Sequence, residues 1–172
     1  MTNTLPEAEV TQVTKLLSML EPGFLPFELF HQIARLVVTP IIELVPLRVS
    51  ATGSVEILLL PRPADDPIWP GQLHVPGTVI RATDSPHSFH DGLQRTVNEL
   101  GDGDIGVPVF VKNLLHPSGR GMEATQVYWV EIKSQPRIGK FYSADKLPTL
   151  IVKTQLDFIP DAIAHFKANR IA

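Results

Sequence analysis

The sequence has no cysteine and no strong excess of charge of either sign. Its 172 residues therefore cannot form disulfides, cysteine-ligated zinc sites, iron–sulfur clusters or a thiol nucleophile. Fifteen lysines and arginines oppose 18 aspartates and glutamates, and the net charge of −3 gives no general attraction to nucleic acid or to an anionic membrane. We therefore expect neither nucleic acid nor a membrane as a partner.

Long uninterrupted hydrophobic runs are also lacking. The most apolar stretch, residues 33–60, is broken by charged residues and a proline, whereas a membrane span needs about 20 mostly apolar residues. The first five residues show neither the basic segment nor the apolar segment of a signal peptide. Together with the absence of cysteine, these features lead us to expect a cytoplasmic protein.

Apolar residues and prolines are abundant instead. The composition is 44% hydrophobic and 19% charged, which is typical of a globular domain with a core of its own. Prolines number 16 against 11 glycines. Because proline breaks the interior of helices, this count argues against a long helical bundle.

Helical spacing dominates the first forty residues. Thr4 and Glu7 have the spacing of a capping box, and apolar residues then recur every three or four positions. A second helix is predicted over residues 26–39, because the proline at position 40 disfavours continuation of a helix. We predict a helical extension over residues 1–40 and a separate domain over residues 41–172.

The second of these units has the pattern of a mixed α+β arrangement. Two helices are predicted, at residues 86–100, where Phe89, Leu93 and Val97 share one face, and at residues 155–169. Strands are predicted at residues 41–49, 54–60, 73–81, 107–115, 125–132 and 140–142. The order of these elements predicts an α+β fold.

One segment, residues 69–101, resembles a known family. It reads WPGQLHVPGTVIRATDSPHSFHDGLQRTVNELG and is similar to the box of the Nudix superfamily, in which a strand leads through Pro-Gly and a loop into a carboxylate-rich helix that ends at glycine. The matching residues are Trp69, Gly71, His74, Pro76 and Gly77 at the entry and Leu100 and Gly101 at the exit. The resemblance covers about residues 41–168 and implies an α/β/α sandwich with a mixed central sheet, outside which the two N-terminal helices lie.

The resemblance also implies a chemistry. In this family the helix gathers Mg²⁺ or Mn²⁺ on its carboxylates, and the metal bridges a diphosphate and activates water. With Leu100-Gly101 as the anchor, the box arginine falls on Gln94 and the glutamate after it on Arg95. The later pair of glutamates falls on Asn98 and Glu99. Only Glu99 is still a carboxylate, so the resemblance implies an eroded catalytic set.

Other positions of the box depart as well. The second box glycine is Thr78, and the upstream glutamate falls on Thr83, or on Asp84 if the longer loop is placed later. A shift by one residue would align Arg95 with the box arginine, but it would put Leu100 on a glutamate position. The one remaining box carboxylate cannot supply a dedicated Mg²⁺ site by itself.

Histidines near the box offer a replacement for the lost glutamates. His74, His87 and His90 lie close in sequence, with Asp84 and Asp91 between them. They could form a metal or general-base cluster. They could equally be packed or solvated polar groups, because aspartate before a helix is a common cap.

Arginines form a second candidate set. Arg62, Arg81, Arg95 and Arg120 could bind the phosphates of a nucleotide, with Trp69 stacked on its base. The alternatives are ordinary surface charge for the arginines and core packing for the tryptophan. Arg81 is the strongest of the set, because it follows the Pro-Gly strand that leads to the family's pocket.

Two functions follow from these residues. The first is a non-catalytic Nudix-like module that binds a nucleotide-type metabolite or a protein partner, and the second is a divergent Mg²⁺-dependent nucleoside diphosphate-X pyrophosphohydrolase. The predicted ligand-binding residues are His74, Gly77, Arg81, Asp84, Arg95 and Asn98, and Glu99 is the residual catalytic and metal-binding carboxylate. We expect no tightly bound cofactor, Mg²⁺ or Mn²⁺ if the protein is active, and a homodimer that buries the apolar faces of the N-terminal helices.

Overall fold

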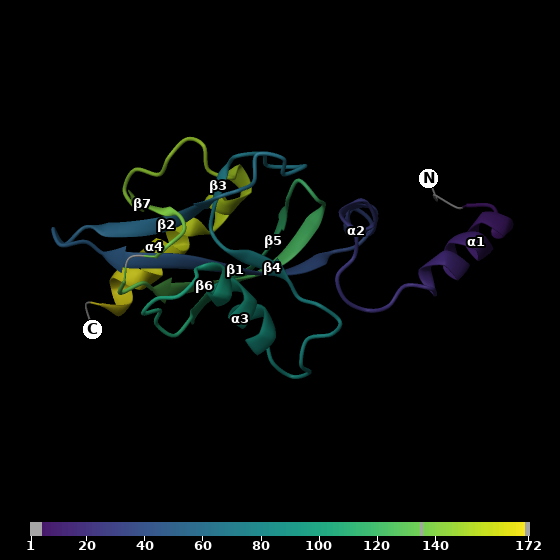
Figure 1. The fold of residues 1–172 in the computed structure, drawn as a ribbon, viewed down its shortest axis with the longest axis horizontal. Helices are drawn as coiled ribbons and strands as arrows, with labels where there is room; N and C mark the ends of the chain where they lie inside the picture. Colours follow the sequence, from purple (N-terminus) through teal and green to yellow (C-terminus); the bar gives the residue numbers. More distant parts are fainter. Residues whose placement is uncertain (1–4, 135, 171–172) are drawn as a thin grey trace.

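A computed structural model describes residues 5–134 and 136–170 of the chain (Figure 1). The elements are, in order, α1 (Glu7–Leu17), α2 (Phe27–Ala34), β1 (Thr39–Val49), β2 (Val55–Pro61), β3 (Leu73–His74), β4 (Gly77–Val79), α3 (His90–Glu99), β5 (Val109–Pro117), β6 (Met122–Glu131), β7 (Lys140–Ser143), the 3₁₀-helix η1 (Lys153–Asp157) and α4 (Ile159–Asn169). The predicted α+β class is confirmed.

Strand β1 is the centre of a seven-stranded mixed sheet. The main order is β3-β2-β1-β6-β5, with β4 paired to β1 and β7 paired to β2. β1 runs parallel to β6, in register from Thr39 opposite Glu123 to Leu47 opposite Glu131, and antiparallel to β2 and β4. Its side chains are buried almost without interruption, as expected for a strand that is covered on both faces.

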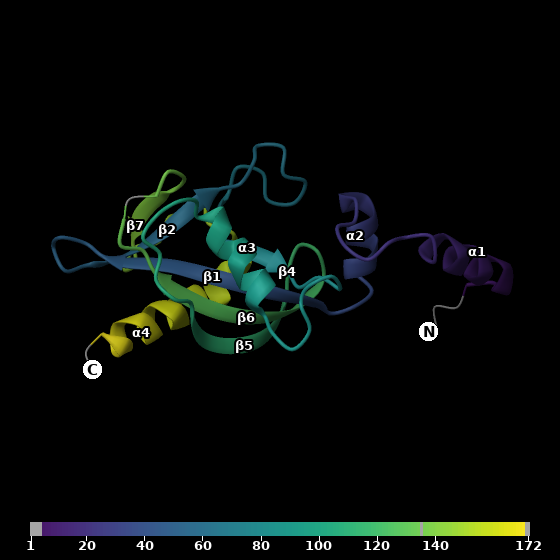
Figure 2. The same ribbon diagram turned by 60° about the horizontal axis from the view of Figure 1, so that its bottom comes forward.

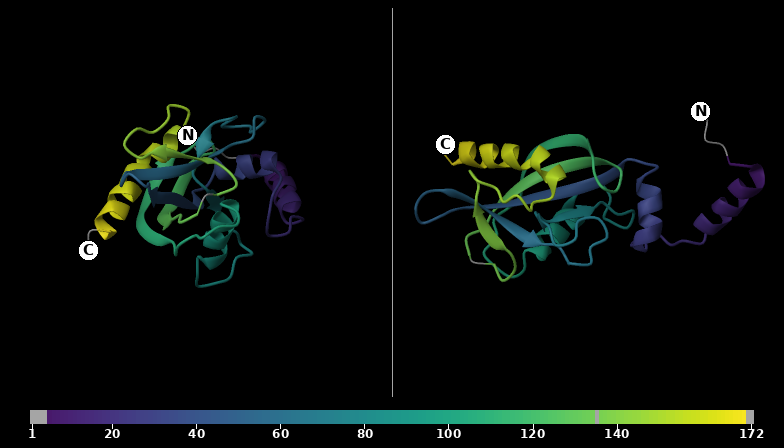
Figure 3. Two further views of the ribbon diagram at one scale, coloured as in Figure 1. Left: turned by 60° about the vertical axis from the view of Figure 1, so that its left-hand side comes forward. Right: turned by 90° about the horizontal axis from the view of Figure 1, so that it is seen from above.

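Helices α3 and α4 cover opposite faces of this sheet (Figures 2 and 3). On the α4 side, Phe158 and Phe166 pack with Leu47 and Trp129 in the larger part of the core. On the α3 side, Leu100 packs with Leu44, Leu58 and Val130. The predicted three-layer arrangement is therefore correct, and the end of α3 is fixed against the central strands.

The segment predicted as one strand over residues 73–81 is two short strands. β3 pairs with β2, and β4 pairs with β1, so the chain crosses from one strand to its neighbour at Val75 and Pro76. Pro76 has no backbone N–H to donate to a ladder, which interrupts the strand at this point. The crossing places Gly77 directly opposite Glu43 of β1.

Both helices of this domain begin later than the sequence pattern predicts. Residues 86–89 are not helical, because His87 has a positive φ of 67°. Phe89, predicted to share a helix face with Leu93 and Val97, therefore lies before the helix and is 44% exposed. At the C-terminus, the helix predicted from residue 155 is the 3₁₀-helix η1, followed by a break at Phe158 and then α4.

The N-terminal helices lie at one end of the molecule. α1 begins at Glu7, directly after Pro6, and none of its residues is buried; the predicted cap residue Thr4 lies outside the described residues. α2 packs against the domain through Ala34, whose carbonyl lies close to Gly121 in the β5–β6 turn. α1 stands away from the sheet in both views (Figures 1 and 2). Among the described helices, none is long and apolar enough to span a membrane.

Candidate functional site

The arginine of α3, Arg95, is engaged in structural contacts. Its Nη1 and Nη2 atoms donate to Oδ1 and Oδ2 of Asp84 at 2.5 and 2.8 Å, and Nη2 also donates to the carbonyl oxygen of Val79 at 3.0 Å. The backbone N–H of Arg81 donates to the same carboxylate at 2.9 Å. These bonds, above all those from Arg95, lower the pKa of Asp84 to about 2. Arg95 thus fastens the loop before α3 to β4.

Glu99 lies one turn further along α3, in a different environment. Its side chain is 39% exposed, and burial of the remainder raises its pKa to about 6, against a weaker opposing effect of Arg62. The nearest ionisable partner is His74, whose Nε2 lies 3.9 Å from Oε1 of Glu99. Burial lowers the pKa of His74 to about 4, so this imidazole is neutral at pH 7 and the contact is not an ion pair.

Two buried carboxylates on the sheet complete the polar region. Glu43 of β1 is almost completely buried, and its pKa is raised well above the usual range by that burial and by the charge of Glu123. It accepts a hydrogen bond from Nε2 of Gln155 at 3.0 Å. A Cβ atom at Gly77 would lie 2.7 Å from this carboxyl group, so only glycine fits there.

The second carboxylate, Glu123 of β6, is held by the β5–β6 turn. Its Oε1 accepts hydrogen bonds from Oγ of Ser118 at 2.8 Å and from Nε and Nη2 of Arg120 at 2.9 and 2.6 Å. The imidazole of His116 lies beside it, with Nε2 at 3.9 Å from Oε2 of Glu123 and 3.1 Å from Oγ1 of Thr125. The turn thus presents one carboxylate and one guanidinium together.

Trp69 lies between two arginines from different loops. The guanidinium carbons of Arg62 and Arg120 are 5.1 and 5.2 Å from its ring centroid. Arg62 donates from Nε to Oδ2 of Asp66 at 2.7 Å, and the other oxygen of Asp66 accepts the backbone N–H groups of Ile68 and Trp69 at 3.0 and 2.7 Å. The proline-rich loop is therefore folded around an arginine–tryptophan–arginine cluster.

Two adjoining pockets meet at this cluster. The larger has a volume of about 470 Å³ and lies between the N-terminal segment 23–40, the 66–69 loop and β4. The smaller has a volume of about 30 Å³ and is lined by polar groups, among them Glu43, His74, His116, Glu123 and Gln155. Both are lined by Arg62, Trp69, Gly77 and Arg120. We call the larger pocket the α2 chamber and the smaller one the acidic pocket.

The structure brings some of the predicted site residues together and not others. Gly77 and Arg81 line the α2 chamber, and His74 lines the acidic pocket. Asp84 and Arg95 bind each other, as described above. Asn98 accepts a hydrogen bond from Nε2 of Gln94 at 2.8 Å on the exposed side of α3.

The predicted histidine cluster does not assemble. His74 is buried on β3, whereas His87 and His90 are exposed beyond the start of α3. Asp91 accepts two hydrogen bonds from Ser85, from its backbone N–H at 2.7 Å and its hydroxyl at 2.8 Å. The aspartates near the box therefore stabilise the loop.

Three buried residues of the acidic pocket, Glu43, Glu123 and Gln155, were not predicted from the sequence. Glu43 interrupts the apolar run of β1, and a charged residue inside a buried strand is the signal that could have identified it. Glu123 and Gln155 carry no comparable local signal. They reach the pocket through the pairing of β1 with β6 and through η1.

The side chains do not form a site for Mg²⁺, which requires about six oxygen ligands in near-octahedral geometry. Within residues 5–134 and 136–170, no three histidine, aspartate or glutamate side chains are placed to hold one metal ion. Glu99 faces a neutral imidazole, while Asp84 and Asp91 are bound elsewhere. The donor set therefore does not fit the metal that the Nudix resemblance implies.

Comparisons with known proteins identify the fold. No family model and no curated protein sequence matches the chain. Among solved structures, it is similar to a mutT/nudix family protein from Listeria innocua, with a TM-score of 0.62 and 15% identity over 77% of this chain and 96% of that one. It is also similar to the Nudix domain of Shewanella oneidensis NrtR complexed with ADP-ribose, with a TM-score of 0.58 and 18% identity over 94% and 99%.

A third similar structure is the Ap4A hydrolase of C. elegans, with a TM-score of 0.54 and 13% identity over 76% of this chain and 98% of that one. These identities are low, and the likenesses extend over most of each chain. They establish a Nudix fold, so the fold that the residues 69–101 predicted is confirmed.

Proposed function

We propose that this Nudix-fold chain binds a phosphorylated, nucleotide-type metabolite and does not hydrolyse it efficiently. The observation that carries the proposal is the state of Glu99, the one box carboxylate. It lies beside the neutral His74, and among the described residues no three histidine, aspartate or glutamate side chains are placed to hold one metal ion. Arg95, at a position where the family has a glutamate or an arginine, is bound to Asp84.

The capacity to bind phosphate rests on Arg62 and Arg120. Guanidinium groups bind phosphate oxygens through paired N–H donors. Both arginines line the same two pockets as Gly77, which is exposed. We place this activity in the cytoplasm, as the cysteine-free composition favours.

A divergent hydrolase is the second candidate. Glu99 favours it, because a carboxylate with a pKa of about 6 is suited to act as a general base near neutral pH. A hydrolase of this kind would need Asp84 or Asp91 as a further metal ligand. The bond from Arg95 to Asp84 or the bond from Ser85 to Asp91 would then have to break. For this reason we rank it second.

Calorimetric titration tests the binding proposal. ADP, ADP-ribose and inorganic diphosphate are titrated into the full chain with and without Mg²⁺. The double variant Arg120→Gln/Glu123→Gln removes the guanidinium without leaving its partner carboxylate unpaired, and we expect a loss of affinity of about tenfold or more for a lost charge-assisted contact.

Arg137→Gln is the matched control, because Arg137 is 78% exposed and lies outside both pockets. It should bind like the wild type. Failure of all three ligands to bind, or equal binding by the double variant, would overturn the proposal.

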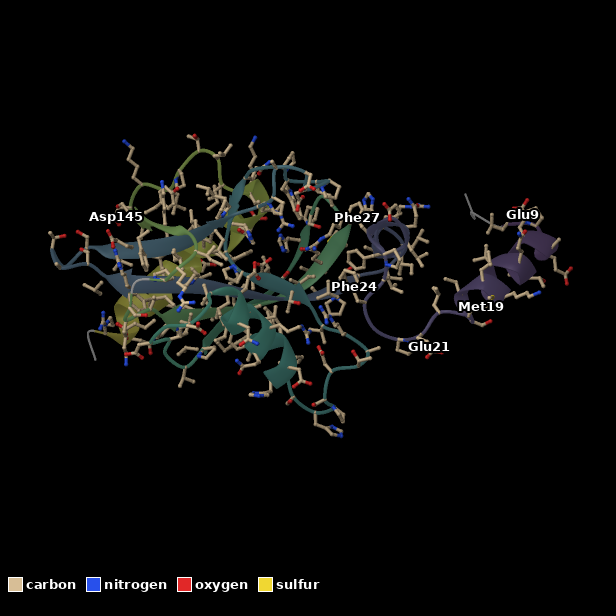
Figure 4. All side chains as sticks on the ribbon, in the orientation of Figure 1. Glu9, Met19, Glu21, Phe24, Phe27 and Asp145 are labelled. Atoms are coloured by element: carbon tan, nitrogen blue, oxygen red, sulfur yellow. The ribbon has the colours of Figure 1, made fainter. Side chains whose placement is uncertain are left out.

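We also propose that α1 pairs with a second copy of the chain. Its apolar side chains are open to solvent, with Leu16 at 58% exposure, and Figure 4 shows the segment around Glu9 and Met19 far from the sheet. Glu7 and Glu9 lie in its first turn and Lys15 in its last, so an antiparallel pair would match opposite charges. Sedimentation should show a dimer that Leu16→Asp dissociates; a wild-type monomer at high concentration would contradict this.

A further inference from the structure

The α2 chamber has the size of a small-molecule site. Its volume of about 470 Å³ falls within the range of roughly 300–1,000 Å³ that is typical of ligand pockets. One wall comes from the N-terminal extension, including Phe24 and Phe27, which Figure 4 labels beside and on α2. The other wall comes from the 66–69 loop and β4.

The walls of the chamber are chiefly apolar. The apolar lining residues from the extension include Phe24, Leu25, Phe27, Phe30, Ile33 and Val37. The opposite wall adds Ile68, Trp69, Val79 and Ile80. Such a surface gains free energy when it covers an apolar group.

Two of the polar side chains in the walls are already bonded to other groups. The carboxylate of Asp66 accepts bonds from Arg62 and from two backbone N–H groups, and the hydroxyl of Thr78 contacts the side chain of Arg95 at 3.4 Å. Arg81 supplies a further charged side chain to the lining, but most of the wall offers no hydrogen-bond partner to the polar edge of a nucleobase, and leaving such an edge unpaired is unfavourable. An apolar group carries no such penalty.

The end of the chamber that adjoins the acidic pocket is cationic instead of apolar. Arg62 and Arg120 each bind their carboxylate through Nε and Nη2, and their Nη1 atoms make no hydrogen bond within the described structure. Both guanidinium groups lie against Trp69. Both arginines line the chamber and the acidic pocket, so each brings a guanidinium donor to the region shared by the two, which suits this region to an anionic group.

We propose that the α2 chamber holds the apolar part of a phosphate ester, such as an alkyl, acyl or prenyl group, while Arg62 and Arg120 bind the phosphate. This inference rests on the proposed binding of a phosphorylated metabolite and narrows its class to one with an apolar end. It gives α2 a role in the site, because Phe27, Phe30 and Ile33 form the wall against which the apolar group packs.

A series of monoalkyl diphosphates of increasing chain length tests the inference by calorimetric titration of the full chain. Inorganic diphosphate and ADP serve as the references without an apolar end. We expect affinity to rise about fourfold for each buried methylene group until the alkyl chain outgrows the chamber. An affinity that does not depend on chain length would overturn the inference and leave the binding of diphosphate and ADP intact.

Two variants on adjacent positions of α2 locate the alkyl group. Ile33→Trp fills the chamber and should remove the dependence on chain length, while inorganic diphosphate binds within about twofold of the wild type. Gln32→Trp is the matched control, because Gln32 is exposed and outside the lining, and it should keep the dependence. Unchanged chain-length dependence in Ile33→Trp would place the alkyl group elsewhere and overturn the inference.

Two further outcomes separate failure of the proposed function from failure of the inference alone. If neither diphosphate, ADP nor any alkyl diphosphate binds, the proposed function fails and the inference fails with it. If alkyl diphosphates bind only after Leu16→Asp dissociates a dimer, the chamber is occupied by the second copy in the native protein, which would also overturn the inference.

Discussion

Two charged side chains of α3, four positions apart, are held in opposite ways. Arg95 donates four hydrogen bonds, two to Asp84, one to the carbonyl oxygen of Val79 and a long one to Thr78. The carboxylate of Glu99 receives no hydrogen bond from the described residues and faces the neutral His74 at 3.9 Å. The comparison shows that one part of this helix fastens a loop, while the other leaves a carboxylate available to a ligand.

Loss of the Arg95 contacts should have the largest effect on stability. Arg95→Ala leaves the largely buried carboxylate of Asp84 without its cation, and hydrogen bonds to charged groups are worth about 1.5–3 kcal/mol each. We expect the free energy of unfolding to fall by about 2–3 kcal/mol, measured by urea denaturation.

Arg137→Ala is the control for this variant. Its ion pair with Asp102 is open to solvent on both sides, at 78% and 88% exposure. Exposed pairs contribute little, so the change should stay within about 0.5 kcal/mol. Equal effects of the two variants would show that Arg95 does not fasten the loop.

The buried carboxyl of Glu43 should have the next largest effect on stability, because burial raises its pKa in the folded state. The folded state then binds more protons than the unfolded state above the ordinary pKa of 4.5, so wild-type stability should decrease as the pH rises through the folded pKa. Glu43→Gln keeps an acceptor for Gln155 and removes the charge. It should be more stable than the wild type at pH 7, by about 1 kcal/mol or more.

The difference between wild type and variant across pH 4–8 is the quantity to measure for Glu43. His74 acts with the opposite sign, because its pKa falls from 6.5 to about 4 on folding, and its contribution to stability is lost as the pH falls through that window. Because His74 is present in both proteins, subtracting the stability curve of Glu43→Gln from that of the wild type removes the His74 contribution. A variant less stable than the wild type at pH 7 would show that the Glu43 charge is stabilising.

Glu99 should give the smallest effect on stability. Its pKa rises to about 6 on folding, so between pH 4.5 and 6 the wild type loses a little stability as the pH increases. Glu99→Gln should flatten this part of the profile, and the partial exposure of the side chain keeps the change small. A clear loss of stability in Glu99→Gln would indicate that the carboxylate has a structural partner.

The sequence predicted the secondary-structure elements of this fold better than the contacts between the residues of the site. The entry of the box, from Trp69 to Gly77, and the burial of Leu100 at the end of α3 follow from local patterns, which also predicted the mixed sheet. The pairing of Asp84 with Arg95 depends on the path of the loop at His87, whose positive φ no periodicity reveals. That pairing was therefore not predicted.

The acidic pocket also could not be predicted from local patterns, because its residues are far apart in the sequence. Glu43 and Glu123 are 80 positions apart, and they approach because β1 runs parallel to β6. Gln155 reaches Glu43 from η1, across 112 positions. Local patterns contain no information about such contacts, which depend on the order of the strands in the sheet.

Product formation from a panel of nucleoside diphosphate-X compounds, with Mg²⁺ or Mn²⁺, tests the central claim most directly. Our account predicts that the wild type releases nucleoside monophosphate no faster than Glu99→Gln, even where titration shows that the compound is bound. Metal-dependent turnover by the wild type that Glu99→Gln abolishes would contradict it and would make the chain a hydrolase.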